Sequence, residues 1–303
     1  MRIRVLGSAA GGGFPQWNCG CPNCRGVRAG TIRATPRRQE SIAISSDGRG
    51  WFLLNTSPEI REQIESFPGL HPQAPRHSPI QAIVLTNGDL DHTLGVLSLR
   101  ESHPITLYAT EGVRRGFTEG NVLYRTLERF PEQVTWRRLP PGQTQPLGGV
   151  GSDLSVTAIP APGKRPLHLE GPGRRPPSPE DNVGFVIREQ SRPRLAYFSG
   201  IAGPSPEVEQ ALADVEVVFF DGTFWSSDEL VAAGLGTRTA EEMAHWPIGG
   251  QGGSLEFLSR PGRTAIYIHI NNTNPILHED SKERRAVTDA GIEIAHDGLD
   301  LDI

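Results

Sequence analysis

The chain centres on the stretch Thr86-Asn87-Gly88-Asp89-Leu90-Asp91-His92-Thr93-Leu94-Gly95. The apolar, β-branched run 80–85 before it predicts a buried strand, and 96–101 after it predicts a helix. Asn, Gly and Asp are also common in plain turns with a capping acid. Asp91 followed directly by His92, at the end of a buried strand, nevertheless favours a metal site.

Two later apolar runs also end in residues that can bind metals. Residues 215–220 are followed by Asp221, and residues 264–268 are followed by His269. Side chains at strand ends are held by the geometry of the sheet, which a metal site requires. A single Asp or His at such a place is more often a cap, but three strand ends of this kind favour one shared site.

The three cysteines of the chain are clustered as Cys19, Cys21 and Cys24. Three thiols at C-x-C-x₂-C spacing can reach one tetrahedral ion, although zinc needs a fourth ligand. We expect a structural Zn²⁺ with His296 as that ligand, because the terminal segment would otherwise be tied down weakly. Reduced surface cysteines without a metal are the alternative.

Length and composition restrict the class of protein. A chain of 303 residues can form one large α/β domain or two smaller ones. The net charge of -5 and the scattered basic residues predict no nucleic-acid or membrane surface, and no apolar run approaches spanning length. The opening residues lack a signal-peptide core, so we expect a soluble, cytoplasmic protein. Monomer and homodimer both stay open.

Strand-type and helix-type segments alternate along the chain. Helices are expected at 59–66, 111–116, 122–129, 206–213 and 281–290, and strands at 3–6, 41–45, 51–55, 106–109, 134–136, 154–159, 183–188 and 195–198. This alternation indicates an α/β fold.

The segment Pro160 to Asn182 is rich in proline and glycine and carries Lys164, Arg165, Arg174 and Arg175. A long segment of this kind inside a compact chain is typical of a lid or an insertion. A solvated loop without a function is an equal alternative.

The motifs resemble those of a known family. The stretches 86–95, Asp221-Gly222-Thr223 and 269–275 resemble the ligand motifs of the metallo-β-lactamase superfamily, and 7–19 resembles the opening of the pyrroloquinoline quinone (PQQ) biosynthesis B proteins. The resemblance runs from the first strand to the last. It implies a single domain over 1–303, an αββα sandwich of two mixed β-sheets flanked by helices, with the insertion at about 160–182.

The chain departs from the hydrolases of this fold, which carry His-x-His-x-Asp-His in the central turn. Asn87 and Asp89 stand where the first two histidines would be. The hydrolases have a further histidine downstream, and in this region the insertion contains only His168. One of the two hydrolytic metal positions is therefore expected to be lost, which leaves Asn87 and Asp89 as candidate substrate contacts. The other position keeps Asp91, His92 and His269, with Asp221 able to approach.

Two histidines and one carboxylate with open positions suit Fe²⁺ that activates O₂, although Zn²⁺ can replace it in purified protein. The resemblance implies hydroxylation or oxidation of a tyrosine-derived precursor of PQQ, a small molecule or a peptide derivative. Arg174 and Arg175 are then candidates for holding its carboxylates.

Two further polar residues belong to the predicted site. His245 is either a proton shuttle or substrate contact, or an exposed histidine at a helix end. Asn55 stands where many relatives carry an acid, and we expect it to hydrogen-bond a ligand Asp or His.

Two other functions compete with the oxygenase. One is a metallohydrolase of phosphodiester or ester bonds, and the other is a non-catalytic carrier of the finished quinone. Counting the bound metal ions under anaerobic conditions distinguishes the oxygenase from the metallohydrolase. O₂ uptake during turnover distinguishes the oxygenase from the carrier.

Overall fold

The computed structural model describes residues 1–148, 153–169, 176–259 and 262–303. Arg174 and Arg175, the predicted carboxylate contacts, lie outside the described residues, so their role stays a prediction.

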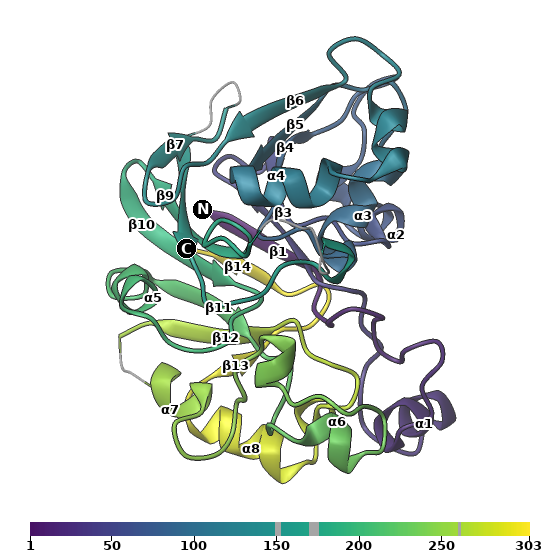
Figure 1. Cartoon of the computed structure of the whole chain (residues 1–303), viewed down its shortest axis with the longest axis vertical. Coiled ribbons are helices and arrows are strands. Elements are labelled where there is room, and N and C mark those ends of the chain that lie inside the picture. Colours follow the sequence, from purple (N-terminus) through teal and green to yellow (C-terminus); the bar gives the residue numbers. More distant parts are fainter. Residues whose placement is uncertain (149–152, 170–175, 260–261) are drawn as a thin grey trace.

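Two seven-stranded sheets form the centre of the molecule (Figure 1). In spatial order, the first sheet contains β14 (Asp300–Asp302), β1 (Arg2–Gly7), β2 (Ser41–Ser45), β3 (Trp51–Leu54), β4 (Ile80–Val84), β5 (Ile105–Ala109) and β6 (Val134–Arg138). The second contains β13 (Glu293–Ile294), β12 (Thr264–Ile268), β11 (Val217–Asp221), β10 (Arg192–Phe198), β9 (Val183–Glu189), β8 (Leu154–Pro160) and β7 (Thr144–Pro146).

The two sheets have the same makeup. In the first, β14, β1, β2 and β3 pair antiparallel, and β3 to β6 pair parallel. In the second, β7 to β10 pair antiparallel and β10 to β13 parallel. Both sheets are therefore mixed, and each has a parallel part whose strands end at one edge.

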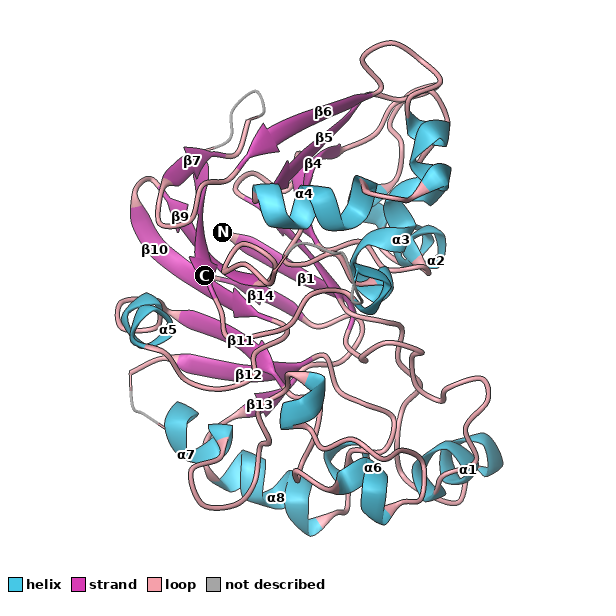
Figure 2. Ribbon diagram, in the orientation of Figure 1, coloured by secondary structure: helices cyan, strands magenta, loops and turns pink. Residues whose placement is uncertain are grey.

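Helices cover the outer faces of both sheets (Figure 2). The α-helices are α1 (Pro22–Ala29), α2 (Ile60–Glu65), α3 (Leu90–Ser98), α4 (Glu111–Thr118), α5 (Pro206–Ala211), α6 (Glu229–Ala232), α7 (Ser254–Leu258) and α8 (Lys282–Asp289). Short 3₁₀ helices are η1 (Pro68–Leu70), η2 (Val122–Leu127), η3 (Leu167–Leu169), η4 (Glu241–Met243) and η5 (Pro275–Leu277). The expected helix at 122–129 is thus a shorter 3₁₀ helix.

Three apolar clusters show the layering. One lies between the sheets and includes Phe52, Tyr108 and Phe219. A second joins the first sheet to α2, α3 and α4, and a third joins the second sheet to α1, α5, α7 and α8. The predicted αββα sandwich is confirmed.

The chain ends are joined by sheet pairing. β14 lies antiparallel to β1, with Arg2 opposite Asp302, and Ser8 donates a hydrogen bond of 2.8 Å to Asp297. The terminal segment therefore needs no metal to hold it in place. In the described part of the chain, no helix is long and apolar enough to cross a membrane.

Candidate metal centre

The loop between β4 and α3 is shorter than the sequence predicts. β4 ends at Val84 and α3 begins at Leu90, inside the motif, because Asp89 has the extended backbone of an N-cap residue. Asp91 and His92 thus lie in the first turn of a helix and not in a loop. His92 is buried and Asp91 half-buried.

The second sheet brings the other two strand ends to the same place. β11 and β12 are parallel neighbours with Asp221 opposite Ile268, so His269 follows beside Asp221. The His269 backbone has a φ of +58°, in the left-handed region that non-glycine residues rarely adopt. Backbone strain of this kind clusters at functional sites.

Asp91, His92 and His269 form one compact cluster. The Nε2 atom of His269 lies 3.2 Å from Asp91 Oδ2, and that of His92 lies 3.6 Å from the same oxygen. One nitrogen or oxygen atom from each residue lies within 4.8 Å of the other two. The predicted ligands from the two sheets are therefore brought together.

A threonine fixes the orientation of His92. The backbone N–H and the hydroxyl of Thr86 both donate to Asn55 Oδ1, each at 3.0 Å. Because the Thr86 hydroxyl hydrogen is used in this way, the 3.0 Å contact between Thr86 Oγ1 and His92 Nδ1 requires the histidine to donate. This network leaves His92 Nε2 as the nitrogen with a free lone pair. Asn55 acts on His92 through Thr86, and not by the direct hydrogen bond that we expected.

A second threonine fixes His269 in the same way. Thr223 Oγ1 donates its one hydrogen to Asp221 Oδ1, at 2.5 Å, or to the His269 carbonyl, at 2.9 Å, and both can only accept. The 2.7 Å contact with His269 Nδ1 is therefore donated by the histidine. Both histidines thus turn Nε2 toward Asp91.

Asp221 holds His245. Its Oδ2 accepts from His245 Nδ1 at 2.7 Å and from the Ile201 N–H at 3.0 Å, while its Oδ1 accepts from the N–H and hydroxyl of Thr223. The His245 ring stacks on that of His269, with centroids 5.4 Å apart, and its side chain is 15% exposed. His245 directly follows Ala244, the C-cap of η4 with a φ of +64°, but it is not an exposed histidine at a helix end, because its side chain is half-buried against Asp221.

The cysteines converge on an asparagine and not on His296. The Nδ2 atom of Asn272 lies 3.2 Å from Cys19 Sγ, 3.6 Å from Cys21 Sγ and 3.4 Å from Cys24 Sγ. His296 is exposed, contacts the Asp297 carbonyl and does not belong to the cysteine cluster. The prediction of His296 as fourth ligand was therefore wrong, since β14 already ties down the terminal segment.

Comparisons with known proteins show the family of the chain. Residues 50–270 match the Beta-lactamase superfamily domain. The coenzyme PQQ synthesis protein B of Azotobacter vinelandii is 43% identical over 312 residues, which cover 100% of both chains. That of Methylobacterium nodulans is 45% identical over 305 residues, which cover 99% of both. The chain belongs to the coenzyme PQQ synthesis protein B family.

Solved structures show the same fold. The crystal structure of Zn²⁺-bound PqqB from Methylobacterium extorquens is 42% identical, with a TM-score of 0.92 and 100% of both chains covered. A diphosphatase of the PhnP family is 22% identical, with a TM-score of 0.69 and 100% of this chain and 97% of that chain covered. The second likeness concerns the fold alone.

In this member of the PQQ synthesis protein B family, Asn87, which the resemblance sets at a histidine position of the fold's hydrolases, pairs with a second amide. Asn87 Nδ2 donates to Asn182 Oδ1 at 3.3 Å, and Asn182 Nδ2 donates to the Gly200 carbonyl at 2.9 Å. His168, the one histidine that the sequence offered for this position, instead contacts the Gly116 carbonyl at 2.9 Å. Asn182 is thus a site residue that the sequence reasoning missed.

The charges of the cluster depend on burial and on neighbours. Burial alone would lower the pKa of His269, but its hydrogen bond to Asp91 and the carboxylates of Asp91, Asp221 and Glu40 raise the pKa to about 9. Burial lowers the pKa of His92 to about 4, in spite of Asp91. For Asp91, burial is outweighed by His92 and His269, which hold its pKa well below the usual range.

Glu40 is a second residue that the sequence reasoning missed. Its fully buried side chain accepts a hydrogen bond of 3.0 Å from Asn55, and its Oε2 lies 3.8 Å from His92 Nε2. Burial raises the pKa of Glu40 to about 8, against the opposing effects of His269 and the Asn55 hydrogen bond. Glu40 is thus a third acid next to the cluster, after Asp91 and Asp221.

The residues present fit a divalent metal ion. Among the described residues, His92 Nε2 is buried without a hydrogen-bond partner, which is costly for a polar atom. His92 Nε2 faces Asp91 and lies beside the imidazole of His269, whose Nδ1 is likewise held by a threonine. An ion bound by Asp91, His92 and His269 would satisfy it, and neutral imidazoles held at Nδ1 are typical of metal ligands.

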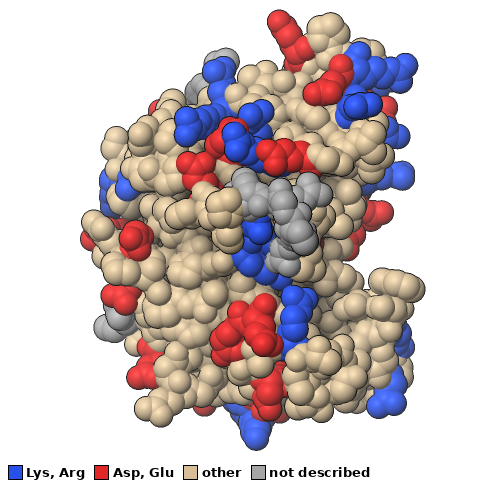
Figure 3. All heavy atoms as spheres, viewed as in Figure 1, with Lys and Arg blue, Asp and Glu red and all other residues tan. Residues whose placement is uncertain are grey.

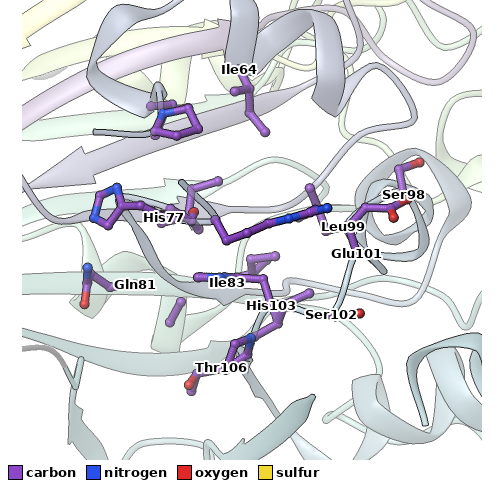
Figure 4. Close-up of a pocket in the computed structure, with 18 residues that line it drawn as sticks. Ile64, His77, Gln81, Ile83, Ser98, Leu99, Glu101, Ser102, His103 and Thr106 are labelled. Atoms are coloured by element: carbon purple, nitrogen blue, oxygen red, sulfur yellow. Dashed lines mark hydrogen bonds between the residues drawn. The ribbon is translucent and has the colours of Figure 1, made fainter. Parts of the chain in front are cut away.

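A separate cavity lies at the other end of β4 (Figure 4). It has a volume of about 630 Å³ and is lined by the start of β4, the end of α3 and residues such as His77 and His103. None of the candidate ligands lines it. The candidate metal centre follows the opposite ends of the same strand and helix, so the two are distinct.

Proposed function

We propose that the chain takes part in PQQ biosynthesis as an oxygenase that uses Fe²⁺, O₂ and an external two-electron reductant to hydroxylate a tyrosine-derived precursor, with the second oxygen atom released as water. The observation that carries the proposal is the compact cluster of Asp91, His92 and His269, two histidines and one carboxylate within reach of one ion. Its family membership supports the pathway, because the relatives are named for coenzyme PQQ synthesis.

The ligand set supports iron over zinc as the reactive metal. Two histidines and one carboxylate leave positions open for O₂ and substrate, the arrangement of non-haem Fe²⁺ oxygenases. Zn²⁺ binds such ligands at least as tightly but has no redox chemistry. We therefore expect protein purified in air to be zinc-loaded or empty at this site, and inactive.

The protein's own residues supply orientation and proton transfer. Thr86 and Thr223 keep the two Nε2 atoms directed at the site. With Nδ1–H held by Asp221, His245 can accept a proton at Nε2 from a phenolic substrate and return it later. Its partial exposure beside His269 suits this role.

We also propose a structural zinc at Cys19, Cys21 and Cys24, with Asn272 as fourth ligand. The amide of Asn272 already lies over all three sulfurs, and rotation by half a turn about its last bond exchanges its nitrogen for its oxygen. Three thiolates and one oxygen complete a tetrahedral site.

One observation favours a metallohydrolase as the second candidate. Asp221, His245 and His269 form a second group able to hold an ion, so two ions sharing His269 would resemble a dinuclear site. Four protein donors already occupy the Asp221 carboxylate, however, which disfavours Asp221 as a ligand.

The test is reconstitution with Fe²⁺ under anaerobic conditions, followed by O₂, a chemical reductant such as ascorbate, and mass spectrometry of a tyrosine-type substrate. We expect isotopically labelled oxygen in the product, and none with Zn²⁺-loaded protein. His92→Ala and His269→Ala should abolish both iron binding and activity but keep the cysteine-bound zinc, whereas Asn87→Ala should be milder. Hydrolysis of a phosphodiester or ester by iron-free, Zn²⁺-loaded protein at enzymatic rates would falsify the proposal.

A further inference from the structure

A pocket of about 390 Å³ lies along the segment 160–165, and its lining includes Asn182, the hydrogen-bond partner of Asn87. Its lining includes Lys164, Arg165, Ser178 and Asn182. Figure 3 shows Lys and Arg side chains, drawn in blue, near the middle of the face that it presents. A volume of this size suits an amino-acid-sized ligand.

Close backbone contacts connect this pocket to the metal centre. A Cβ atom added to Gly88, in the central turn, would lie 2.9 Å from Pro166 Cγ. One added to Gly163 would lie 2.4 Å from Asn182 Nδ2. Lys164 therefore lies on a segment that packs against both the central turn and Asn182, the partner of Asn87.

Asn182 connects the pocket lining to the neighbourhood of His245. A Cβ atom added to Gly200 would lie 3.9 Å from Asn182 Oδ1 and 4.0 Å from His245 Cε1. Asn182, which lines the pocket, and His245 therefore both lie close to Gly200. The pocket is a suitable place for the part of a substrate that does not react.

Lys164 and Arg165 are the two cations of the pocket lining. Arg165 and Asp181 both already interact with other groups, and Asp181 Oδ2 accepts from the Ser178 N–H at 2.8 Å. In the described parts of the chain, half-buried Lys164 forms no hydrogen bond or ion pair within 4 Å, although its charge acts on Asp89. The other acid of the lining, Glu207, is exposed at the rim.

We propose that Lys164 binds a carboxylate of the substrate in this pocket and so places the substrate's reactive part against the candidate metal centre. The proposal rests on the proposed function only for the identity of the substrate. A half-buried ammonium without a partner gains a charge-assisted hydrogen bond from a carboxylate, at little cost in desolvation. Arg174 and Arg175, expected earlier for this role, need not take part.

The test compares two probes that differ only in the carboxylate, N-acetyl-L-tyrosine and N-acetyl-L-tyrosinamide. Binding to Zn²⁺-loaded protein is measured by calorimetry without O₂, so that the outcome does not depend on turnover. We expect the acid to bind roughly tenfold more tightly than the amide, as one charged hydrogen bond would provide.

Lys164→Gln should remove this difference without changing the affinity of the amide, and Lys164→Arg should keep most of it. Lys282→Gln is the matched control, because Lys282 is exposed on α8 and is the one other lysine of the chain. Equal binding of acid and amide, or a preference unchanged in Lys164→Gln, would overturn the proposal and leave the oxygenase proposal intact. A preference for the acid in a protein that fails to hydroxylate would support it on its own.

Discussion

Each histidine of the metal centre is held by a threonine on the nitrogen that faces away from the site. Thr86 accepts from His92 and Thr223 accepts from His269, and both threonines are in turn fixed by Asn55 or Asp221. Partners of this kind select one tautomer and raise the basicity of a ligand. Metal affinity should therefore depend on hydroxyl groups that never touch the ion.

We expect Thr86→Val to weaken metal binding by roughly 10–100-fold, because the buried His92 Nδ1–H loses its acceptor and the free tautomer shifts. Thr86→Ser keeps the hydroxyl and should bind almost normally. The measurement is a Co²⁺ titration, with the d–d absorption reporting this site and thiolate bands reporting the cysteines. Equal affinities in the two variants would contradict the role given to Thr86.

Metal binding should also depend on pH through His269. Its pKa is raised to about 9, so at neutral pH the metal must displace a proton that Asp91 helps to hold. Below that pKa, affinity should fall by roughly tenfold per pH unit, and about one proton should be released for each ion bound. Apparent dissociation constants between about pH 7 and 9, with proton release in weak buffer, check this.

The interaction between His269 and Asp91, which opposes metal binding, stabilises the fold of the metal-free protein. Since the folded pKa of His269 lies above its usual 6.5, the charged pair with Asp91 stabilises the fold near neutral pH. That contribution is lost as the pH rises through about 9. Asp91, whose pKa is lowered, loses its part when the pH falls below its ordinary value. If the metal affinity did not change between about pH 7 and 9 and no proton were released on binding, His269 would be neutral in the metal-free protein.

At the scale of elements, two loops join the cysteine cluster to the metal centre. Asn272 follows His269 by three residues, and Ala10 donates to the Ile270 carbonyl at 2.9 Å. Gly11 then packs on the ligand itself, since a Cβ atom there would lie 3.2 Å from Asp91 Oδ2. The cysteine cluster is thus placed to hold in position the loops that carry His269 and contact Asp91.

Asn272→Ala should therefore lower zinc retention and the melting temperature, and should also weaken metal binding at Asp91, His92 and His269. His296→Ala should change none of these, because its side chain is exposed and away from the cysteines. Zinc content after dialysis against a chelator, thermal melting and the Co²⁺ titration give the three readings. Loss of zinc in the His296→Ala variant would show that His296 is a zinc ligand.

The whole molecule is held by the apolar layer between the sheets. Phe219 of β11 is fully buried there, two residues before Asp221 on the same strand. Strand alternation turns neighbouring side chains to opposite faces, so the strand that carries Asp221 is packed on both sides.

Phe219→Ala should lower the free energy of unfolding by about 3–5 kcal/mol, the usual cost of a cavity left by a buried aromatic ring. Denaturation by urea at constant metal content measures it. The control Val231→Ala lies on α6 and is 45% exposed, so it should change stability by less than about 0.5 kcal/mol. A small effect of Phe219→Ala would mean that the two sheets can close over the cavity.

Residues next to one another in the sequence made most of the site predictable. The apolar runs before Asp91, Asp221 and His269 indicated buried strands, and parallel strands bring their carboxyl ends to one edge. The C-x-C-x₂-C spacing likewise indicated a shared ion. Local periodicity determines such features, and they survive folding because each depends on only a few neighbouring residues.

Contacts across the fold were decided by the tertiary structure alone. Asn182 meets Asn87 across 95 positions, Asn272 reaches Cys24 across 248, and Glu40 becomes a buried acid only after two sheets close over it. An isolated Asn or Glu carries no periodic signal, so the sequence could not select these residues. His296 failed for the same reason: its distance from the cysteines follows from the pairing of β14 with β1, which local sequence does not encode.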